Sequence, residues 1–225
     1  LVQWCVGRHP DRNVRVAILG ESDTDEAIFA SLLRAAGAES VDLVPNPPLR
    51  SRGWPAVRSI APTVIRHVYF RTSADGLVIL FDSNGSPVHS TAHELEPKEG
   101  CRTCELIAVV ADTLPTLPSV HGREGFEAVV ATAVPCVEAW LVAPQDHQVS
   151  EAAWVNGQQE GKYPYTCLEL KTRAYGSSRP TRTVIEAAVD DFQNNVRSSL
   201  AAVRQRFPMG LSEPLRVVGD WSKAG

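Results

Sequence analysis

Three acidic side chains in this sequence each come shortly after an apolar run. Glu21 follows residues 14–20, Asp82 follows residues 77–81, and Glu138 comes just after residues 128–134. Carboxylate oxygens are the ligands that Mg²⁺ and Mn²⁺ prefer, and two or three of them leave coordination positions open for a phosphate. The pattern predicts a divalent-metal site. The ordinary alternative is that Glu21 and Asp82 are turn and cap residues, because Asp is common where strands end.

The segments that must position these carboxylates alternate between strand and helix patterns. Residues 14–19, 77–81 and 128–134 are continuous apolar runs of strand length, as in strands buried on both faces. After the first run, Ser22 is a candidate N-cap with Asp25 as its capping-box partner, and apolar residues follow at helical spacing. This alternation predicts an α/β fold, Rossmann-like, with a mostly parallel sheet covered by helices. Functional groups gather at the carboxyl ends of such strands.

The remaining segments are less regular. A short strand is expected within residues 41–44, and a helix within residues 55–67 that Pro62 interrupts. Residues 144–182 are polar with little periodicity, residues 183–206 form a long amphipathic helix pattern, and residues 215–218 have the composition of an edge strand. We therefore expect an α/β core over 1–145, and over 146–225 a polar loop region followed by a long helix that packs on the core.

The acidic segments also resemble a known family. Segment 21–25 (ESDTD) resembles the first motif of the Toprim (topoisomerase–primase) domain, a Glu after a buried strand with an acidic residue four positions on. Segment 80–85 (LFDSNG) resembles the second motif, Asp-x-Asp. Segment 133–141 (AVPCVEAWL) is similar to small stand-alone bacterial Toprim-like proteins of uncharacterised function, which are related to the overcoming-lysogenisation-defect nuclease domains. The resemblance covers roughly residues 14–145.

This resemblance implies a Rossmann-like Toprim sheet, Mg²⁺ or Mn²⁺ as cofactor, and cleavage of phosphodiesters in DNA or RNA, with phage defence as one setting. It implies that Glu21 is a general acid/base or metal ligand, Asp82 the principal metal ligand and Glu138 a further catalytic acid. Two positions depart from the family: Ser22 replaces the usual Gly, and Asn84 replaces the second Asp of Asp-x-Asp. Asn84 can still offer a carbonyl oxygen to a cation, but it removes one negative charge.

Asn84 keeps a second hypothesis open. A Toprim-like site with one carboxylate fewer is compatible with a binding or regulatory component of a multi-protein bacterial system, with an ATPase or another protein as partner. A third hypothesis is an unrelated Rossmann-like enzyme for a small phosphorylated molecule.

A local basic cluster is the candidate nucleic-acid contact. Lys171 and Arg173, with Arg179 and Arg182 nearby, are interleaved with tyrosines in an otherwise acidic protein. Such side chains contact phosphates and stack on bases, and members of the small Toprim-like group tend to carry a Lys near position 171. The alternative is a solvated loop, and the sequence slightly favours it.

A second candidate metal site has the spacing His89-x₃-His93-x₇-Cys101-x₂-Cys104. These spacings suit Zn²⁺, but the order of ligands is reversed relative to zinc fingers and the intervening segment is short. The alternative is that Cys101 and Cys104 share the inner face of a helix. Metal analysis distinguishes the two readings.

Composition excludes several classes. The formal net charge is −4, so this is no simple basic nucleic-acid binder. Five cysteines, an odd number, argue against a disulfide framework, and no apolar run reaches the roughly 18–20 residues of a membrane span. With no signal-like segment at Leu1, we expect a cytoplasmic location and no membrane partner. Walker, dinucleotide-binding and Gly-x-Ser-x-Gly motifs are absent from the sequence.

Overall fold

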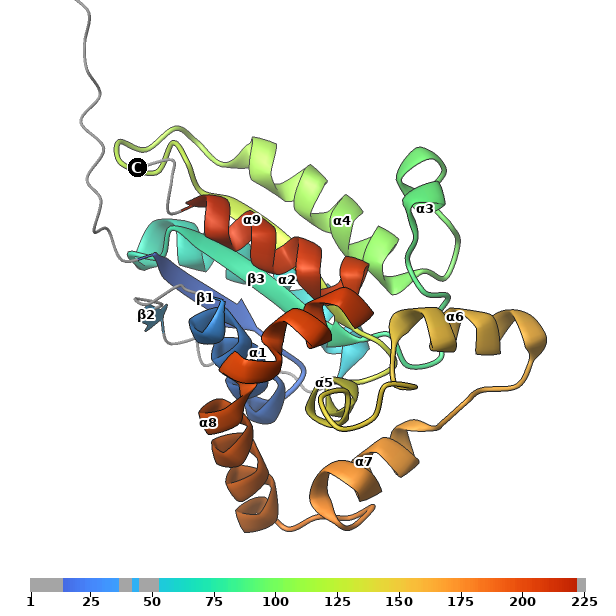
Figure 1. Cartoon of the computed structure of the whole chain (residues 1–225). Helices are drawn as coiled ribbons and strands as arrows, with labels where there is room; N and C mark the ends of the chain where they lie inside the picture. Colours follow the sequence, from blue (N-terminus) through green and yellow to red (C-terminus); the bar gives the residue numbers. More distant parts are fainter. Residues whose placement is uncertain (1–13, 37–41, 45–52, 222–225) are drawn as a thin grey trace, which may run out of the picture.

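A computed structural model describes residues 14–36, 42–44 and 53–221. Its centre is a parallel sheet in the order β2-β1-β3-β4 (Figure 1). The strands span Arg15–Leu19 (β1), Asp42–Val44 (β2), Gly76–Asp82 (β3) and Glu127–Ala133 (β4). The predicted α/β class with a parallel sheet is confirmed, and each predicted strand of the core is present to within about two residues at either end.

Helices cover both faces of the sheet. Alternate side chains of β1 and β3 point to opposite faces, as the pleat requires. One face packs against α2 (Trp54–Arg71) and α4 (Arg102–Thr113). The other face packs against α1 (Asp23–Ala35) and the C-terminal helices, which together form the larger apolar core. Since strands enclosed on both sides must be apolar throughout, the continuous runs in the sequence are explained.

The junction between β1 and α1 is tight, and it fixes Glu21. Ser22 is the N-cap as predicted, because its Oγ accepts a hydrogen bond of 3.3 Å from the amide of Asp25. The amide of Gly20 donates to Oε1 of Glu26 at 3.0 Å. Glu21 is therefore held between a strand end and the first turn of a helix.

The expected interruption at Pro62 is wrong. Helix α2 runs without a break from Trp54 to Arg71 and contains Pro62 in its interior. Proline removes one helical hydrogen bond, but Val57, Ala61, Val64, Ile65 and Val68 are all buried along the same helix. Burial of this apolar stripe outweighs the missing bond.

Two short helices occupy the region expected to be a polar loop. They are α6 (Glu151–Glu160) and α7 (Cys167–Tyr175), and they follow α5 (Glu138–Val142), whose start was predicted. Ser150 caps α6, and Thr166 forms a capping box with Glu169 in α7. Gly161 and Gly176 end the two helices with φ of 67° and 71°, in the left-handed region that favours glycine. Only a narrow stripe of each helix is buried, so the apolar residues in this part of the sequence show little helical periodicity.

The long helix α8 (Arg182–Arg206) matches its prediction, but the expected edge strand does not exist. A π-helical turn, η2 (Pro208–Ser212), leads into α9 (Glu213–Trp221). One side of α9 is buried through residues at a spacing of three: Leu215, Val218 and Trp221. Residues at this spacing share a face in a helix but not in a strand, which favours the helix.

The C-terminal segment is tied to α6 and to the sheet. The buried carboxylate of Glu151 accepts hydrogen bonds from the amides of Met209 and Gly210. The indole of Trp221 covers Gly76 at the start of β3 so closely that a Cβ on Gly76 would come within 2.5 Å of the ring. Its Nε1 also donates to Oε2 of Glu127 at 2.7 Å.

Two short elements complete the chain: α3 (Thr91–Leu95) and the 3₁₀ turn η1 (Leu114–Thr116). Within the described ranges, none of the helices is apolar over a length that could cross a bilayer.

Candidate metal centre

Glu21 and Asp82 meet where β1 and β3 end side by side. Oε1 of Glu21 accepts a hydrogen bond of 3.0 Å from the backbone amide of Asp82. Oδ1 of Asp82 in turn accepts one of 3.1 Å from the amide of Val137, in the connection that follows β4. The parallel register of β1, β3 and β4 brings all three strand ends to one edge, so the predicted meeting of these two residues is present in the structure.

Asp25 is a fourth carboxylate of this group; the sequence analysis took it as a capping-box partner and as the acidic residue of the first Toprim motif, but did not place it in the metal site. It is buried in the first turn of α1. Burial, together with the negative charges of Glu138 and Glu21, raises the pKa of Asp25 to about 7. The signal was available, because Asp25 stands four positions after Glu21 on the sheet-facing side of a predicted helix.

The carboxylates repel one another. Burial raises the pKa of Asp82 well above its usual range, and the charges of Asp25, Glu138 and Glu21 add to this effect. Burial also raises the pKa of Glu21, although hydrogen bonds from the amides of Asp82 and Trp54 and the charge of Arg102 oppose the rise. Within the described chain, Glu21, Asp25, Asp82 and Glu138 therefore form an acidic cluster, and a cation placed among them would relieve its repulsion.

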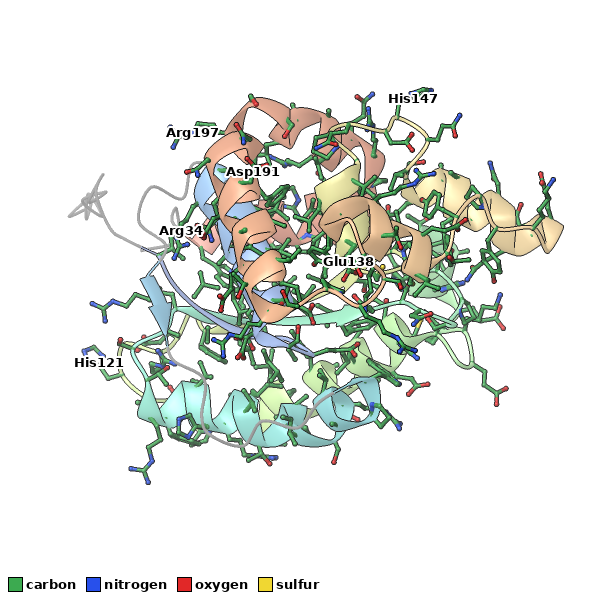
Figure 2. All side chains as sticks on the ribbon, turned by 90° about the horizontal axis from the view of Figure 1, so that it is seen from below. Arg34, His121, Glu138, His147, Asp191 and Arg197 are labelled. Atoms are coloured by element: carbon green, nitrogen blue, oxygen red, sulfur yellow. The ribbon has the colours of Figure 1, made fainter. Side chains whose placement is uncertain are left out.

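Glu138 opens α5 from inside the molecule. It is only 5% exposed, and Figure 2 shows it among the helices, whereas His147 and Arg197 lie on the outside. Its Oε1 lies 3.9 Å from Nζ of Lys171 on α7. Burial and the neighbouring Glu138 carboxylate, through its charge and a side-chain hydrogen bond, raise the pKa of the Tyr175 hydroxyl, so Lys171 and Tyr175 are polar neighbours of Glu138.

Two basic side chains border the acidic cluster. Arg102, the first residue of α4, donates from Nη1 to the carbonyl oxygen of Asp82 at 2.8 Å and lies over the ring of Trp54. Lys171 is partly exposed; burial lowers its pKa, but the charge of Glu138 and neighbouring groups outweighs this, and the pKa is raised overall. Arg102 is a site residue that sequence reasoning missed, because nothing local marks it.

Asn84 lies in the turn after β3 and is exposed. Its backbone amide donates to the carbonyl oxygen of Pro135 at 3.0 Å, so the turn is tied to the connection that carries Glu138. The side chain of Asn84 is exposed beside this turn, and its predicted role as a metal ligand stays a prediction. Asp25, rather than Asn84, supplies the fourth acidic group.

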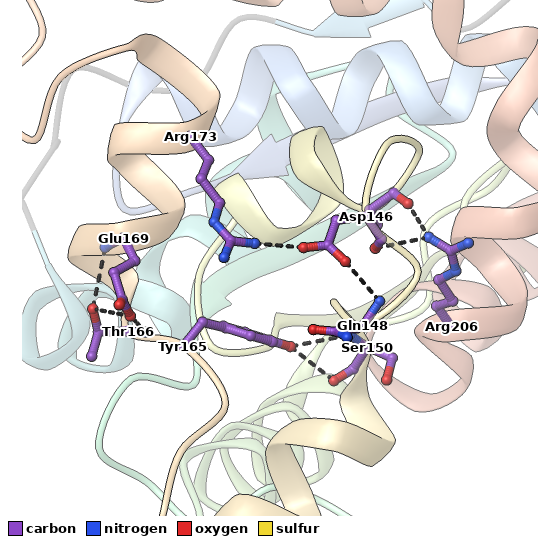
Figure 3. Close-up of polar contacts among 9 residues, drawn as sticks. Asp146, Gln148, Ser150, Tyr165, Thr166, Glu169, Arg173 and Arg206 are labelled. Carbon is purple, nitrogen blue, oxygen red and sulfur yellow. Dashed lines mark hydrogen bonds and ion pairs between the residues drawn. The ribbon is translucent and has the colours of Figure 1, made fainter.

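The predicted nucleic-acid contacts separate in the structure. Lys171 faces the acidic cluster, whereas Arg173 forms an ion pair with Asp146 (Figure 3). Asp146 also accepts from the amide of Gln148 at 2.9 Å, and Arg206 donates to the carbonyl oxygens of Ala143 and Asp146. Arg173 therefore belongs to a network that fastens α7 and α8 to the turn after α5.

The interleaved tyrosines are mostly interior. Tyr165 and Tyr175 are buried, and the hydroxyl of Tyr165 exchanges hydrogen bonds with the backbone of Ser150. Tyr163 stacks on Trp154 with ring centroids 4.4 Å apart. The first two cannot stack on bases from their buried positions.

Two thiols form the inner border of the cluster. A hydrogen bond between Cys136 and Cys167 raises the pKa of Cys136 and lowers that of Cys167. The charges of Glu138 and Asp82 add to the rise at Cys136. Trp140 of α5 is fully buried next to Phe29.

Carboxylate oxygens are the ligands that a hard divalent cation prefers, although among the described residues only His89, His93, Cys101 and Cys104 bring three or more potential ligand atoms within 4.8 Å of one another. The carboxylate oxygens of the cluster come from a strand–helix turn, a strand end and two helix starts. The pKa values of Glu21, Asp25 and Asp82 are all raised, so neighbouring positive charges and hydrogen bonds compensate their negative charge only in part. Comparison of the chain with protein-family models, with curated proteins and with solved structures gave no match, so the argument about function rests on this geometry.

Proposed function

We propose that this chain is a Toprim-like enzyme that cleaves phosphodiester bonds in DNA or RNA with Mg²⁺ or Mn²⁺. The observation that carries the proposal is the convergence of Glu21, Asp25, Asp82 and Glu138, at the carboxyl edge of a parallel sheet, with raised pKa values at the first three. That edge is where parallel α/β sheets bind ligands. The order of the motifs along the chain is that of the Toprim family, and phage defence is a setting in which such enzymes act.

Asp82, Glu138 and Asp25 are the residues that would hold the metal. Asp82 is oriented by the amide of Val137, and Glu138 is buried beside Lys171. When bound, the metal supplies Lewis-acid activation of the phosphate and a more acidic water. A cation would favour ionisation of the cluster below neutral pH, because burial and the neighbouring charges raise the pKa of Asp25 to about 7.

Glu21 is suited to proton transfer. Its raised pKa places it nearer to neutral pH than an exposed glutamate, which favours a general acid or base. The amides of Asp82 and Trp54 both donate hydrogen bonds to this carboxylate, so the backbone fixes its position. Arg102, bonded to the carbonyl oxygen of Asp82, and Lys171, beside Glu138, would neutralise the phosphate and its developing charge.

The experiment combines binding with turnover. Mn²⁺ binding is measured by calorimetry, and cleavage of single- and double-stranded DNA and of RNA is assayed with Mg²⁺ and Mn²⁺. We expect Asp82→Asn to lose metal binding and at least about a hundredfold in cleavage. Glu186→Gln is the matched control, because Glu186 is an exposed carboxylate paired with Arg182 on α8. Cleavage that is unchanged in Asp82→Asn contradicts the proposal.

A second candidate function is favoured by Asn84. With an amide in place of the second aspartate, the same site can bind metal and nucleic acid without turnover and serve as a regulatory component beside an ATPase or another protein. Metal-dependent binding of nucleic acid by the wild type, without cleavage in any of the assays, selects this function. Replacing Asn84 with Asp would then be expected to create measurable cleavage.

A further inference from the structure

Four metal-ligating side chains come together at a second place, between the end of β3 and the start of α4. They come from two pairs in the sequence, and one potential ligand atom of each lies within 4.8 Å of all the others: His89, His93, Cys101 and Cys104. Both sulfurs are buried and the two histidines are half-buried. None of the four belongs to the acidic cluster.

The distances match the edges of a zinc tetrahedron. Nδ1 of His89 lies 3.7 Å from Sγ of Cys101 and 3.5 Å from Sγ of Cys104. With Zn–S of about 2.3 Å and Zn–N of about 2.0–2.1 Å, the nitrogen–sulfur edge of a tetrahedral site is about 3.6 Å. The side chains are therefore already spaced as ligands of one ion.

Hydrogen bonding alone does not account for the arrangement. An imidazole nitrogen has either one proton or one lone pair, yet two sulfurs approach the same Nδ1 of His89. In addition, Nδ1 of His93 is buried and has no hydrogen-bond partner among the described residues. A metal ion at the centre would satisfy both thiols and anchor both rings, which their mutual contacts cannot do.

The segment that carries the ligands lacks a core of its own. No residue of α3 is buried, and Leu95 is 91% exposed. A turn at Gly100, with φ of 75°, brings the amide of Cys101 to the carbonyl of Lys98 at 3.1 Å. With so little apolar burial, the excursion from 89 to 101 needs another source of stability, and a structural zinc supplies folding free energy directly.

We propose that one Zn²⁺ binds in a closed, structural site with four ligands: His89, His93, Cys101 and Cys104. The two thiols release their protons to solvent as the Zn–S bonds form. The site clamps the start of α4, where Cys101 is the N-cap residue and Arg102 follows directly. Since Arg102 reaches the carbonyl of Asp82, the zinc positions this arginine at the acidic cluster without taking part in chemistry there.

The test is metal analysis of the full chain expressed with zinc and purified without chelators. We expect about one zinc per chain in the wild type, and a loss of most of it in Cys104→Ser and in His93→Ala. Two controls should keep the zinc: Cys167→Ser, which removes a thiol outside the site, and the double variant Glu21→Gln/Asp82→Asn. The double variant makes the zinc result independent of the proposed function.

The proposal is overturned if the wild-type protein contains no more than trace zinc. It is also overturned if the double variant loses its zinc while Cys104→Ser keeps it. Should the cysteine variant fail to fold, Co²⁺ exchanged into the wild type answers the same question. A tetrahedral spectrum with a thiolate-to-cobalt charge-transfer band is expected. An octahedral spectrum without that band rejects the site.

The effect of zinc on the segment before α4 can be measured separately. After removal of zinc by a chelator, hydrogen exchange should become faster at the amides of residues 96–104, while the amides of β3 and β4 stay protected. Unchanged exchange over 96–104 would show that the ion does not hold this segment, and would overturn the positioning role given to it.

Discussion

Oε1 of Glu21 accepts the backbone amide hydrogen of Asp82 at 3.0 Å, so the first acidic residue of the cluster is positioned by the main chain of the second. The bond joins the ends of neighbouring parallel strands. A substitution of the Asp82 side chain therefore leaves the orientation of Glu21 largely intact, and the two carboxylates can be examined separately.

The cluster predicts that stability depends on pH and on metal together. Asp25 has a pKa of about 7 in the folded protein against an ordinary value of 3.8. Between these pH values the unfolded chain binds fewer protons, so the free energy of unfolding should fall as the pH rises from about 4 to 7, by about 4 kcal/mol at most for this group. Chemical denaturation of metal-free protein across this range measures the slope.

Mg²⁺ should reduce that slope, and Asp25→Asn should reduce it without Mg²⁺. Glu151 is the internal control: burial raises its pKa to about 7 as well, but its carboxylate binds the amides of Met209 and Gly210 and should not respond to metal. A slope that Mg²⁺ leaves unchanged would contradict metal binding by Asp25.

Arg102 is predicted to set the acidity of Glu21. Its positive charge lowers the pKa of Glu21, against the effect of burial, so Arg102→Ala should raise that pKa further and shift the lower limb of the pH–activity profile to higher pH. Arg102→Lys keeps the charge and should shift the limb less. Arg173→Ala, which removes an arginine paired with Asp146, serves as the control, and an equal shift there would refute the assignment.

Lys171 and Arg173 are predicted to differ in kind although they are two residues apart. Lys171→Met should weaken nucleic-acid binding roughly tenfold at low ionic strength and lower its salt dependence, with little change in Tm. Arg173→Met should instead lower Tm, because it breaks the network of Asp146 and Arg206 seen in Figure 3. Binding titrations and thermal melts of both variants measure the contrast; equal binding losses would restore the sequence-based view of one basic patch.

Gly210 is predicted to tolerate no side chain. A Cβ there would lie 2.0 Å from the carbonyl oxygen of Thr132 and 2.7 Å from Oε1 of Glu151, so Gly210→Ala should cost about 3 kcal/mol or more of stability. A Cβ added to Gly219 would meet no neighbouring residue within 4 Å. Gly219→Ala in helix α9 should therefore raise the free energy of unfolding by about 0.5–1 kcal/mol. Urea unfolding of the two variants measures the change in the free energy of unfolding. Similar changes for Gly210→Ala and Gly219→Ala would argue against the packing of η2 on β4.

The buried strands and the place of Glu21 and Asp82 could be predicted because continuous apolar runs define strands and parallel strands share one carboxyl edge. Asp25 was recognised as a cap partner and as the acidic residue of the first motif, but its burial beside the other carboxylates depends on which face of the first turn of α1 meets the sheet, and the local sequence does not reveal that. The position of Arg102 at the acidic cluster and the approach of His89 to Cys104 both depend on the path of the chain between β3 and α4, which local sequence patterns do not determine. Helix α9 was mistaken for a strand because Leu215, Val217 and Val218 form a short apolar stretch, interrupted by Arg216, that fits both the strand and the helix period.

The contact of Trp221 with Gly76 has a consequence for biosynthesis. Its indole covers the start of β3 and bonds to Glu127 of β4, yet it is translated after every strand of the sheet. While the ribosome is still extending the chain, that end of the sheet lacks its cover, and the nascent protein exposes apolar surface that chaperones recognise. Final closure of the core is therefore expected after α9 has left the exit tunnel.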